Sequence, residues 1–92
     1  MKGPEPRRAR AVGQRLDATV YVGRAGATDA AAAELLAQLK NHPLVKVRIS
    51  RDAGGERREV AAKLAAMAGG DLVEIRGFTA VVAKRRGKGR PD

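Results

Sequence analysis

The sequence predicts an α/β domain of the two-layer α+β type, with a four-stranded mixed sheet and helices mainly on one face. The chain has 92 residues, which is enough for one domain and too few for two. Hydrophobic residues make up 43% of it, but Tyr21 and Phe78 are its only aromatic residues, so its core must be thin and aliphatic. Helical and β-branched stretches follow one another in the order helix, strand, helix, strand, helix, strand, strand.

The chain is expected to begin with a flexible basic stretch over residues 1–6 and to end with a flexible basic tail over residues 86–92. The domain between them, residues 7–85, opens with a short helix at about residues 7–16, where apolar side chains recur every three or four positions. Residues 19–22 are β-branched and aromatic and stop at a glycine, which is typical of a strand that enters a turn.

The clearest predicted helix follows this turn. Thr28 is a good N-cap residue, and the alanine-rich run after it continues to about residue 41. Leu35, Leu36 and Leu39 fall on one stripe of this helix, so that stripe is expected to face the core.

The second half of the chain predicts a strand, a helix and a tight hairpin, at residues 44–49, 56–68, 72–76 and 78–84. In the strand, Lys46 and Arg48 alternate with apolar residues and share one face. In the helix, Val60, Leu64 and Met67 lie on one side. Strand-helix-strand units require parallel pairing and the hairpin requires antiparallel pairing, so the sheet is predicted to be mixed.

Charge indicates the class of partner. Lys and Arg number 19 against 10 Asp and Glu, which gives a net charge of +9. Such an excess repels itself in a folded domain, and nucleic acid is the commonest polyanion that neutralises it. No apolar run approaches the roughly 20 residues of a membrane span, no apolar segment follows the basic start as in a signal peptide, and there is no Cys. A cytoplasmic location is therefore expected.

The turn after the first strand is a candidate phosphate site with the pattern GxxG, formed by Gly23, Arg24, Ala25 and Gly26. Glycines permit positive φ and close approach of the backbone, and the helix capped by Thr28 offers unpaired amides at its N-terminus. An arginine at the tip can bind two phosphate oxygens at once. The alternative is a strand-to-helix turn that only needed flexibility.

Further basic residues are candidate nucleic-acid contacts because they are expected to line one face or to flank the domain. They are Arg7, Arg8, Arg10, Lys46, Arg48, Arg76, Lys84 and Arg85. Charges that merely cover the solvent side of a sheet are the alternative explanation for those on strands.

These motifs together resemble a known family. A strand that ends in Val22-Gly23, a basic residue, a second glycine, a Thr-capped helix, and a His before the strand at residues 44–49 resemble the YhbY-like family. This family is also called the CRM domain, of chloroplast RNA splicing and ribosome maturation proteins. The resemblance extends over about residues 7–85.

The resemblance implies a fold like the C-terminal domain of bacterial translation initiation factor three. It also implies binding of structured RNA and, for free-standing members, association with rRNA in precursors of the large ribosomal subunit. The family's glycine loop, comparable with that of KH domains, falls on residues 23–26. We expect a monomeric RNA-binding protein with no cofactor.

Other functions remain as alternatives. Alba-like chromatin proteins are also small and basic, but they act as dimers and are not recognised by this glycine turn. A ribosome-associated module that binds protein would use its charge only for proximity to rRNA. An enzyme is not expected, because the chain offers no recognisable nucleophile, base and oxyanion set, and the lone His42 and dispersed acids do not form a metal site.

Aromatic residues are too scarce for a base-stacking platform. Tyr21 and Phe78 both fall in predicted strands, where we expect at least partial burial. Recognition is therefore expected to depend on phosphates, 2′-hydroxyl groups and RNA shape, with a strong dependence on salt.

Overall fold

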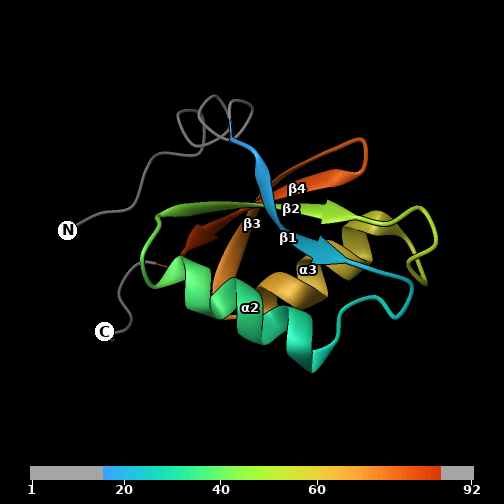
Figure 1. Ribbon diagram of the computed structural model, residues 1–92. Helices are drawn as coiled ribbons and strands as arrows, with labels where there is room; N and C mark the ends of the chain where they lie inside the picture. Colours follow the sequence, from blue (N-terminus) through green and yellow to red (C-terminus); the bar gives the residue numbers. More distant parts are fainter. Residues whose placement is uncertain (1–15, 86–92) are drawn as a thin grey trace.

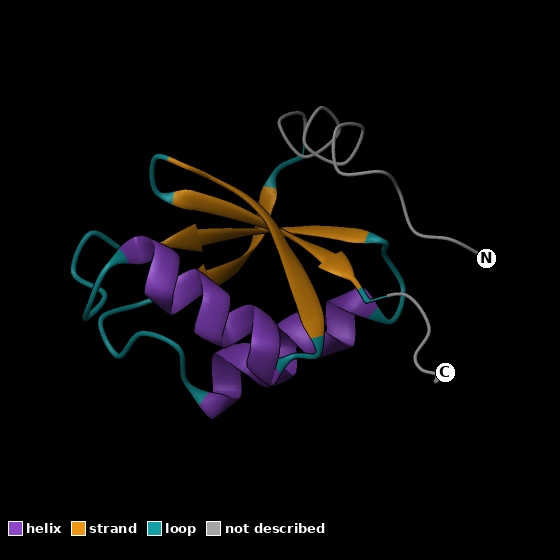
Figure 2. Ribbon diagram, turned by 180° about the vertical axis from the view of Figure 1, so that it is seen from behind, coloured by secondary structure: helices purple, strands orange, loops and turns teal. Residues whose placement is uncertain are grey.

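The computed structural model describes residues 16–85, which form two layers (Figure 1). The elements are β1 (Ala18–Val22), α2 (Asp29–Leu39), β2 (Leu44–Ile49), α3 (Arg57–Met67), β3 (Gly70–Arg76) and β4 (Thr79–Lys84). Both helices lie against the same side of the sheet, as the view from behind also shows (Figure 2). The predicted α+β architecture is confirmed, whereas the predicted helix at residues 7–16 lies outside the described residues except for Leu16.

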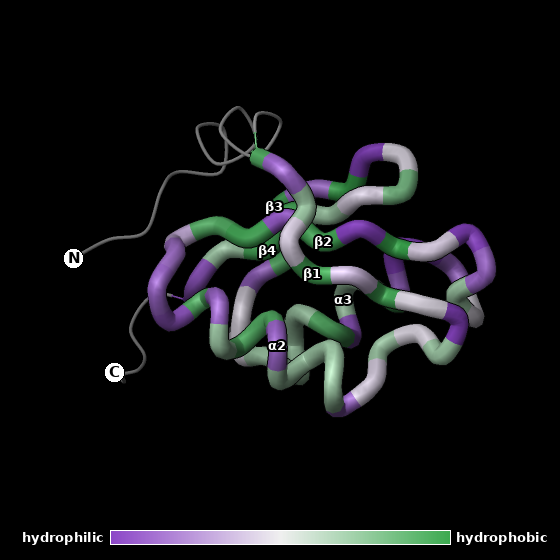
Figure 3. Tube along the Cα trace, viewed as in Figure 1, coloured by the Kyte–Doolittle hydropathy of each residue, from purple (hydrophilic) through white to green (hydrophobic). Residues whose placement is uncertain are grey.

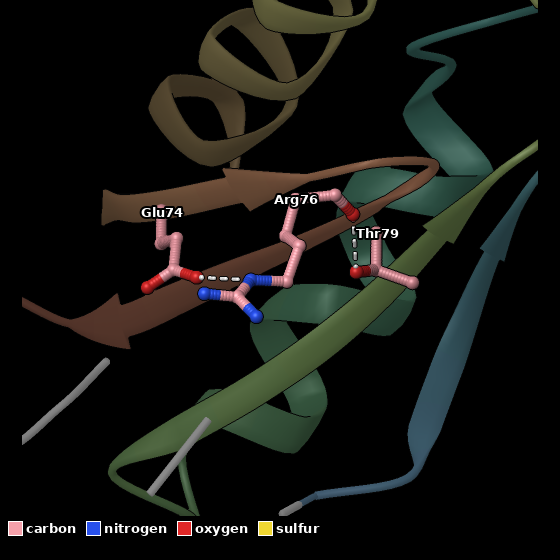
Figure 4. Close-up of polar contacts among 3 residues, drawn as sticks. All are labelled: Glu74, Arg76 and Thr79. Atoms are coloured by element: carbon pink, nitrogen blue, oxygen red, sulfur yellow. Dashed lines mark hydrogen bonds and ion pairs between the residues drawn. The ribbon is translucent and has the colours of Figure 1, made fainter. Parts of the chain in front are cut away.

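The sheet is mixed, with strand order β1-β2-β4-β3. β1 and β2 are parallel, as expected for strands joined through a helix, and β4 pairs antiparallel with both β2 and β3. The β3–β4 hairpin turns through Gly77 and Phe78, so Phe78 belongs to the turn and not to the predicted strand. The Thr79 hydroxyl closes this turn by donating to the Arg76 carbonyl oxygen at 2.9 Å (Figure 4).

Small side chains on the helices bring them close to the sheet. Besides larger apolar residues, α2 buries Ala32, and α3 buries Ala61 and Ala65. Two predicted core residues are instead partly exposed: Leu36 keeps 44% and Met67 keeps 38% of its surface open. The alanines rotate the buried stripe of each helix, so Leu36 and Met67 lie at its flank.

The connection from α3 to β3 is abrupt. Gly69 adopts φ +71°, a left-handed conformation that ends helices and that glycine adopts without strain. Gly70 then begins β3 against the neighbouring strand. A Cβ on Gly70 would lie 2.8 Å from Cγ1 of Val82 and 2.9 Å from the carbonyl oxygen of Ala83. The backbone of β3 therefore approaches β4 more closely than a residue with a side chain permits.

Gly70→Ala should consequently destabilise the fold. Overpacking a well-filled core by one methyl group costs about 1–3 kcal/mol, and here the obstructing atoms include backbone. Gly54→Ala is the matched control, since a Cβ there meets nothing within 4 Å and its φ is not positive. Urea denaturation followed by circular dichroism measures both changes, and equal midpoints for the two variants would contradict the close approach at Gly70.

Candidate nucleic-acid interface

The glycine turn is a tight turn between β1 and α2. The Gly26 amide donates to the Gly23 carbonyl oxygen at 3.0 Å, which closes the turn around Arg24 and Ala25. Gly26 is buried with φ +77°, so its position favours glycine on conformational grounds. Gly23 is exposed, and a Cβ on it would meet no atom within 4 Å. The space beside Gly23 is therefore open to an approaching ligand.

Arg24 and Ala25 form the exposed tip of this turn. In the described part of the chain, the ion pairs are Arg76 with Glu74 and Arg85 with Asp71, so Arg24 has no carboxylate partner there. A guanidinium group without a partner keeps all its donors for a ligand, and its planar fork matches the oxygens of a phosphate.

The start of α2 stands behind the turn. The Thr28 hydroxyl accepts a hydrogen bond from the Ala31 amide at 3.1 Å, which confirms the predicted N-cap. Asp29 lies in the first turn of the helix, and its negative charge already compensates the helix dipole. An anion is therefore better placed at the Arg24 tip than directly on the helix axis.

A shallow hollow of about 350 Å³ lies between β1, the glycine turn and the first half of α2. Its wall includes Tyr21, Gly23, Ala25, Gly26, Thr28 and Glu34. The Glu34 carboxylate accepts a hydrogen bond from Gln38 at 2.8 Å, so its charge is held on the α2 side of the hollow. This acidic side also favours a phosphate position at the glycine turn rather than beside α2.

The loop after β2 lies directly beside the glycine turn. The Ser50 amide donates to the Val22 carbonyl oxygen at 2.8 Å, and the Gly54 carbonyl oxygen is 3.9 Å from where a Cβ on Gly26 would stand. Both loops follow parallel strands that end at the same edge of the sheet (Figure 1). Hydrophilic residues mark this edge in both loops (Figure 3).

The second loop and α3 carry three arginines that sequence patterns did not single out. Arg51, Arg57 and Arg58 line a hollow of about 370 Å³ together with Phe78. The guanidinium carbons of Arg57 and Arg51 lie 4.3 Å and 5.1 Å from the centre of the Phe78 ring. Contact with the aromatic face orients a guanidinium group while its N–H edge remains available to bind oxygen.

The sequence did contain a pattern that could have marked these arginines as candidate ligand contacts. The loop after β2, a strand that pairs in parallel with β1, contains Arg51 and a glycine pair, and Arg57 and Arg58 follow soon after it. Ligands of open α/β sheets gather at the carboxyl ends of parallel strands, so this loop was as good a candidate as the glycine turn.

The sheet face opposite the helices carries the other predicted strand residues. Tyr21, Arg48, Thr79 and Arg76 are cross-strand partners in one row, and Lys46 stands two residues before Arg48 on the same face. The structure thus places Lys46, Arg48 and Arg76 together. Arg76 is paired with Glu74 at 3.2 Å, which offsets part of its charge (Figure 4).

The expected burial of Tyr21 is wrong. Its surface is 66% exposed, because β1 is an edge strand and the residue faces away from the helices. Phe78 is half-buried under its two arginines, as expected, although it belongs to the turn rather than to a strand. The open face therefore offers one accessible aromatic ring beside Arg48.

The remaining predicted contact residues do not lie at the edge formed by the glycine turn and the loop after β2. Lys84 and Arg85 stand at the other end of β4, where the Arg85 guanidinium binds Asp71 at 3.2 Å and the Gly70 carbonyl oxygen at 3.0 Å. Arg85 thus has a structural partner. The predicted contacts Arg7, Arg8 and Arg10 lie outside the described residues.

Residues 16–85 contain no helix with the length and apolar character needed to cross a membrane. Within the same range, no three His, Asp or Glu side chains gather as ligands for a metal ion.

Comparison with known proteins identifies the family. The CRS1/YhbY (CRM) domain family matches residues 1–84. The chain belongs to the CRM domain family. CRM domains form an RNA-binding family, and this membership separates the chain from the Alba-like alternative. No curated protein sequence gives a significant match.

The fold of this CRM domain is shared with a solved structure. A hypothetical protein of Staphylococcus aureus, described as a candidate RNA-binding protein, has a solution structure that superposes with a TM-score of 0.78. The two chains are 20% identical, and the alignment covers 92% of this chain and 88% of the other. The similarity at this identity concerns the fold.

Thr28→Ala tests how the cap supports the site. Loss of an N-cap hydroxyl costs about 1 kcal/mol of unfolding free energy, and Thr28→Ser should retain most of it because the serine hydroxyl can accept from the same Ala31 amide. Chemical denaturation of the three proteins measures the difference. Identical stabilities of the Ala and Ser variants would show that the hydrogen bond contributes nothing.

Proposed function

We propose that this CRM domain binds structured RNA through the phosphate backbone at the edge formed by the glycine turn and the loop after β2. The observation that carries the proposal is the hydrogen bond from Ser50 to Val22, which holds the two loops side by side. Arg24 on one loop and Arg51 and Arg57 at the other are exposed, and the contact between the loops leads us to expect that they share one surface.

The chemistry of this edge suits a phosphate backbone better than a small ligand. Both hollows are shallow, and arginines line one of them while the exposed Arg24 stands beside the other. Contacts from guanidinium groups to phosphate oxygens carry no base identity, so the edge supports affinity and orientation more than sequence discrimination. The net charge of +9 adds long-range attraction toward any polyanion.

The target we propose is rRNA in a precursor of the large ribosomal subunit, bound by a monomer in the cytoplasm during ribosome maturation. Membership in the CRM family supports RNA as the partner class. The resemblance to free-standing YhbY-like members supports the choice of the large subunit. In-cell crosslinking followed by RNA sequencing tests this choice, and recovery of mainly tRNA or intron sequences would contradict it.

Arg24→Glu should weaken binding to structured rRNA fragments about tenfold or more, since a hydrogen bond to a charged group contributes roughly 1.5–3 kcal/mol. Lys63→Glu is the matched control, because it makes the same change in net charge at an exposed position of α3 outside the site. Fluorescence anisotropy of labelled RNA at physiological salt measures both. Equal losses of affinity in the two variants would contradict a specific phosphate contact by Arg24 and would leave it only a contribution to the net charge.

Arg51→Gln and Arg57→Gln should each lower the slope of log affinity against log salt by roughly one, because each variant leaves one phosphate without its neutralising cation. Arg51→Lys and Arg57→Lys keep the charge and should keep the slope, while forfeiting part of the guanidinium geometry. Titrations at several salt concentrations measure the slopes. An unchanged slope in both Gln variants would remove the loop after β2 from the interface.

A further inference from the structure

We infer that Tyr21 stacks on an unpaired base of the bound RNA, next to the phosphate held at the glycine turn. The inference rests on the proposed function and adds a nucleotide-recognition element to it. Bases inside a duplex already stack on their neighbours, so the base that Tyr21 receives belongs to a bulge, loop or single-stranded extension beside the structured region.

The exposure of Tyr21 is the first observation. A β-branched and aromatic strand normally buries its large rings, yet this ring is 66% exposed on an edge strand and faces away from both helices. Within residues 16–85, the rings and guanidinium groups in contact are those of Phe78 with Arg51 and Arg57. No such group covers the Tyr21 ring in that range, so its face is available to a ligand.

The position of Tyr21 is the second observation. It precedes Gly23 by two residues, which in a strand is roughly 7 Å, and it lines the same hollow as the turn. This spacing is comparable with the length of one nucleotide. A strand whose phosphate lies at Gly23 and Arg24 can therefore place the attached or adjacent base against Tyr21.

Charge on the same face is the third observation. Arg48 is the direct cross-strand partner of Tyr21, and Lys46 precedes it by two residues on the same side of β2. Positive charge beside an aromatic ring is the combination that single-strand-binding surfaces use, because the ring takes the base while the cations take the backbone. Glu74 lies in the same cross-strand row as Lys46, but it is paired with Arg76, and β2 and β4 stand between its strand and β1.

The apolar residues of the open face do not cover the end of the sheet that adjoins the glycine turn. Leu44 and Val81 form a small cluster with Leu16, Val73 and Ala83. Leu44 begins β2 and Val81 pairs with Lys46, so this cluster extends from the start of β2 to its middle and does not reach the row of Tyr21 and Arg48. The end that adjoins the turn is the one that carries Tyr21 and Arg48.

The chain provides its own probe, because Tyr21 is its one tyrosine and it has no tryptophan. The test uses an rRNA-derived hairpin with a short unpaired extension and the same hairpin with a blunt end. We expect tyrosine emission, corrected for RNA absorption, to fall on saturation with the extended hairpin. Tyr21→Ala should weaken binding of the extended hairpin about fivefold or more, since stacking on one base contributes roughly 1–3 kcal/mol.

Controls separate this inference from the proposed function. Tyr21→Phe should retain the affinity, and Leu36→Ala, at another exposed apolar residue, should not change it. The blunt hairpin should bind Tyr21→Ala and the parent protein alike. Unchanged emission, or equal affinity of Tyr21→Ala and the parent protein for the extended hairpin, would overturn the stacking role while the effect of Arg24→Glu upheld RNA binding at the turn. Failure of the parent protein to bind either RNA would overturn both.

Discussion

β1 and β2 run side by side in the same direction, and the Ser50 amide extends their pairing to the Val22 carbonyl oxygen. Two segments that lie almost 30 residues apart in sequence thereby leave the sheet at one edge. The glycine turn and the arginine-bearing loop are neighbours only because of this parallel pairing. With antiparallel strands, the two loops would stand at opposite ends of the sheet, and the basic residues would form no common surface.

The alanine-rich helices set the second constraint. Because both helices pack on one face, the core is a single layer of aliphatic side chains between them and the sheet. The opposite face has no helix over it among the described residues, so Tyr21 and Arg48, which alternate with core residues, are exposed there, whereas Leu44 and Val81 are buried in a small cluster of their own. The same alternation that buries Val20 and Val22 therefore presents Tyr21 to solvent. Exposure of this ring follows from the two-layer architecture and from the edge position of β1.

Sequence patterns were sufficient for most of the fold. Periodicity, the Thr28 cap and the glycines predicted the described elements to within a few residues, because these signals are local. Patterns failed where the outcome depends on tertiary packing. Whether Met67 or Ala65 faces the sheet depends on how closely the helix approaches it, and whether Tyr21 is covered depends on strand order. The contact of Arg51 and Arg57 with Phe78 could not be predicted for the same reason, since only the folded sheet brings Phe78 against them.

The acidic residues near the edge limit where an anion can bind. Asp29 occupies the first turn of α2, and Glu34 lines the hollow from the same helix, so the helix N-terminus and the α2 side of the hollow both carry negative charge. A phosphate is consequently directed outward, toward Arg24 at the tip and toward the arginines of the neighbouring loop. Tyr21 lines the same hollow as the glycine turn, so a backbone held at that turn would lie near the exposed ring. The acids that disfavour a phosphate beside α2 are thus consistent with the base contact that we infer for Tyr21.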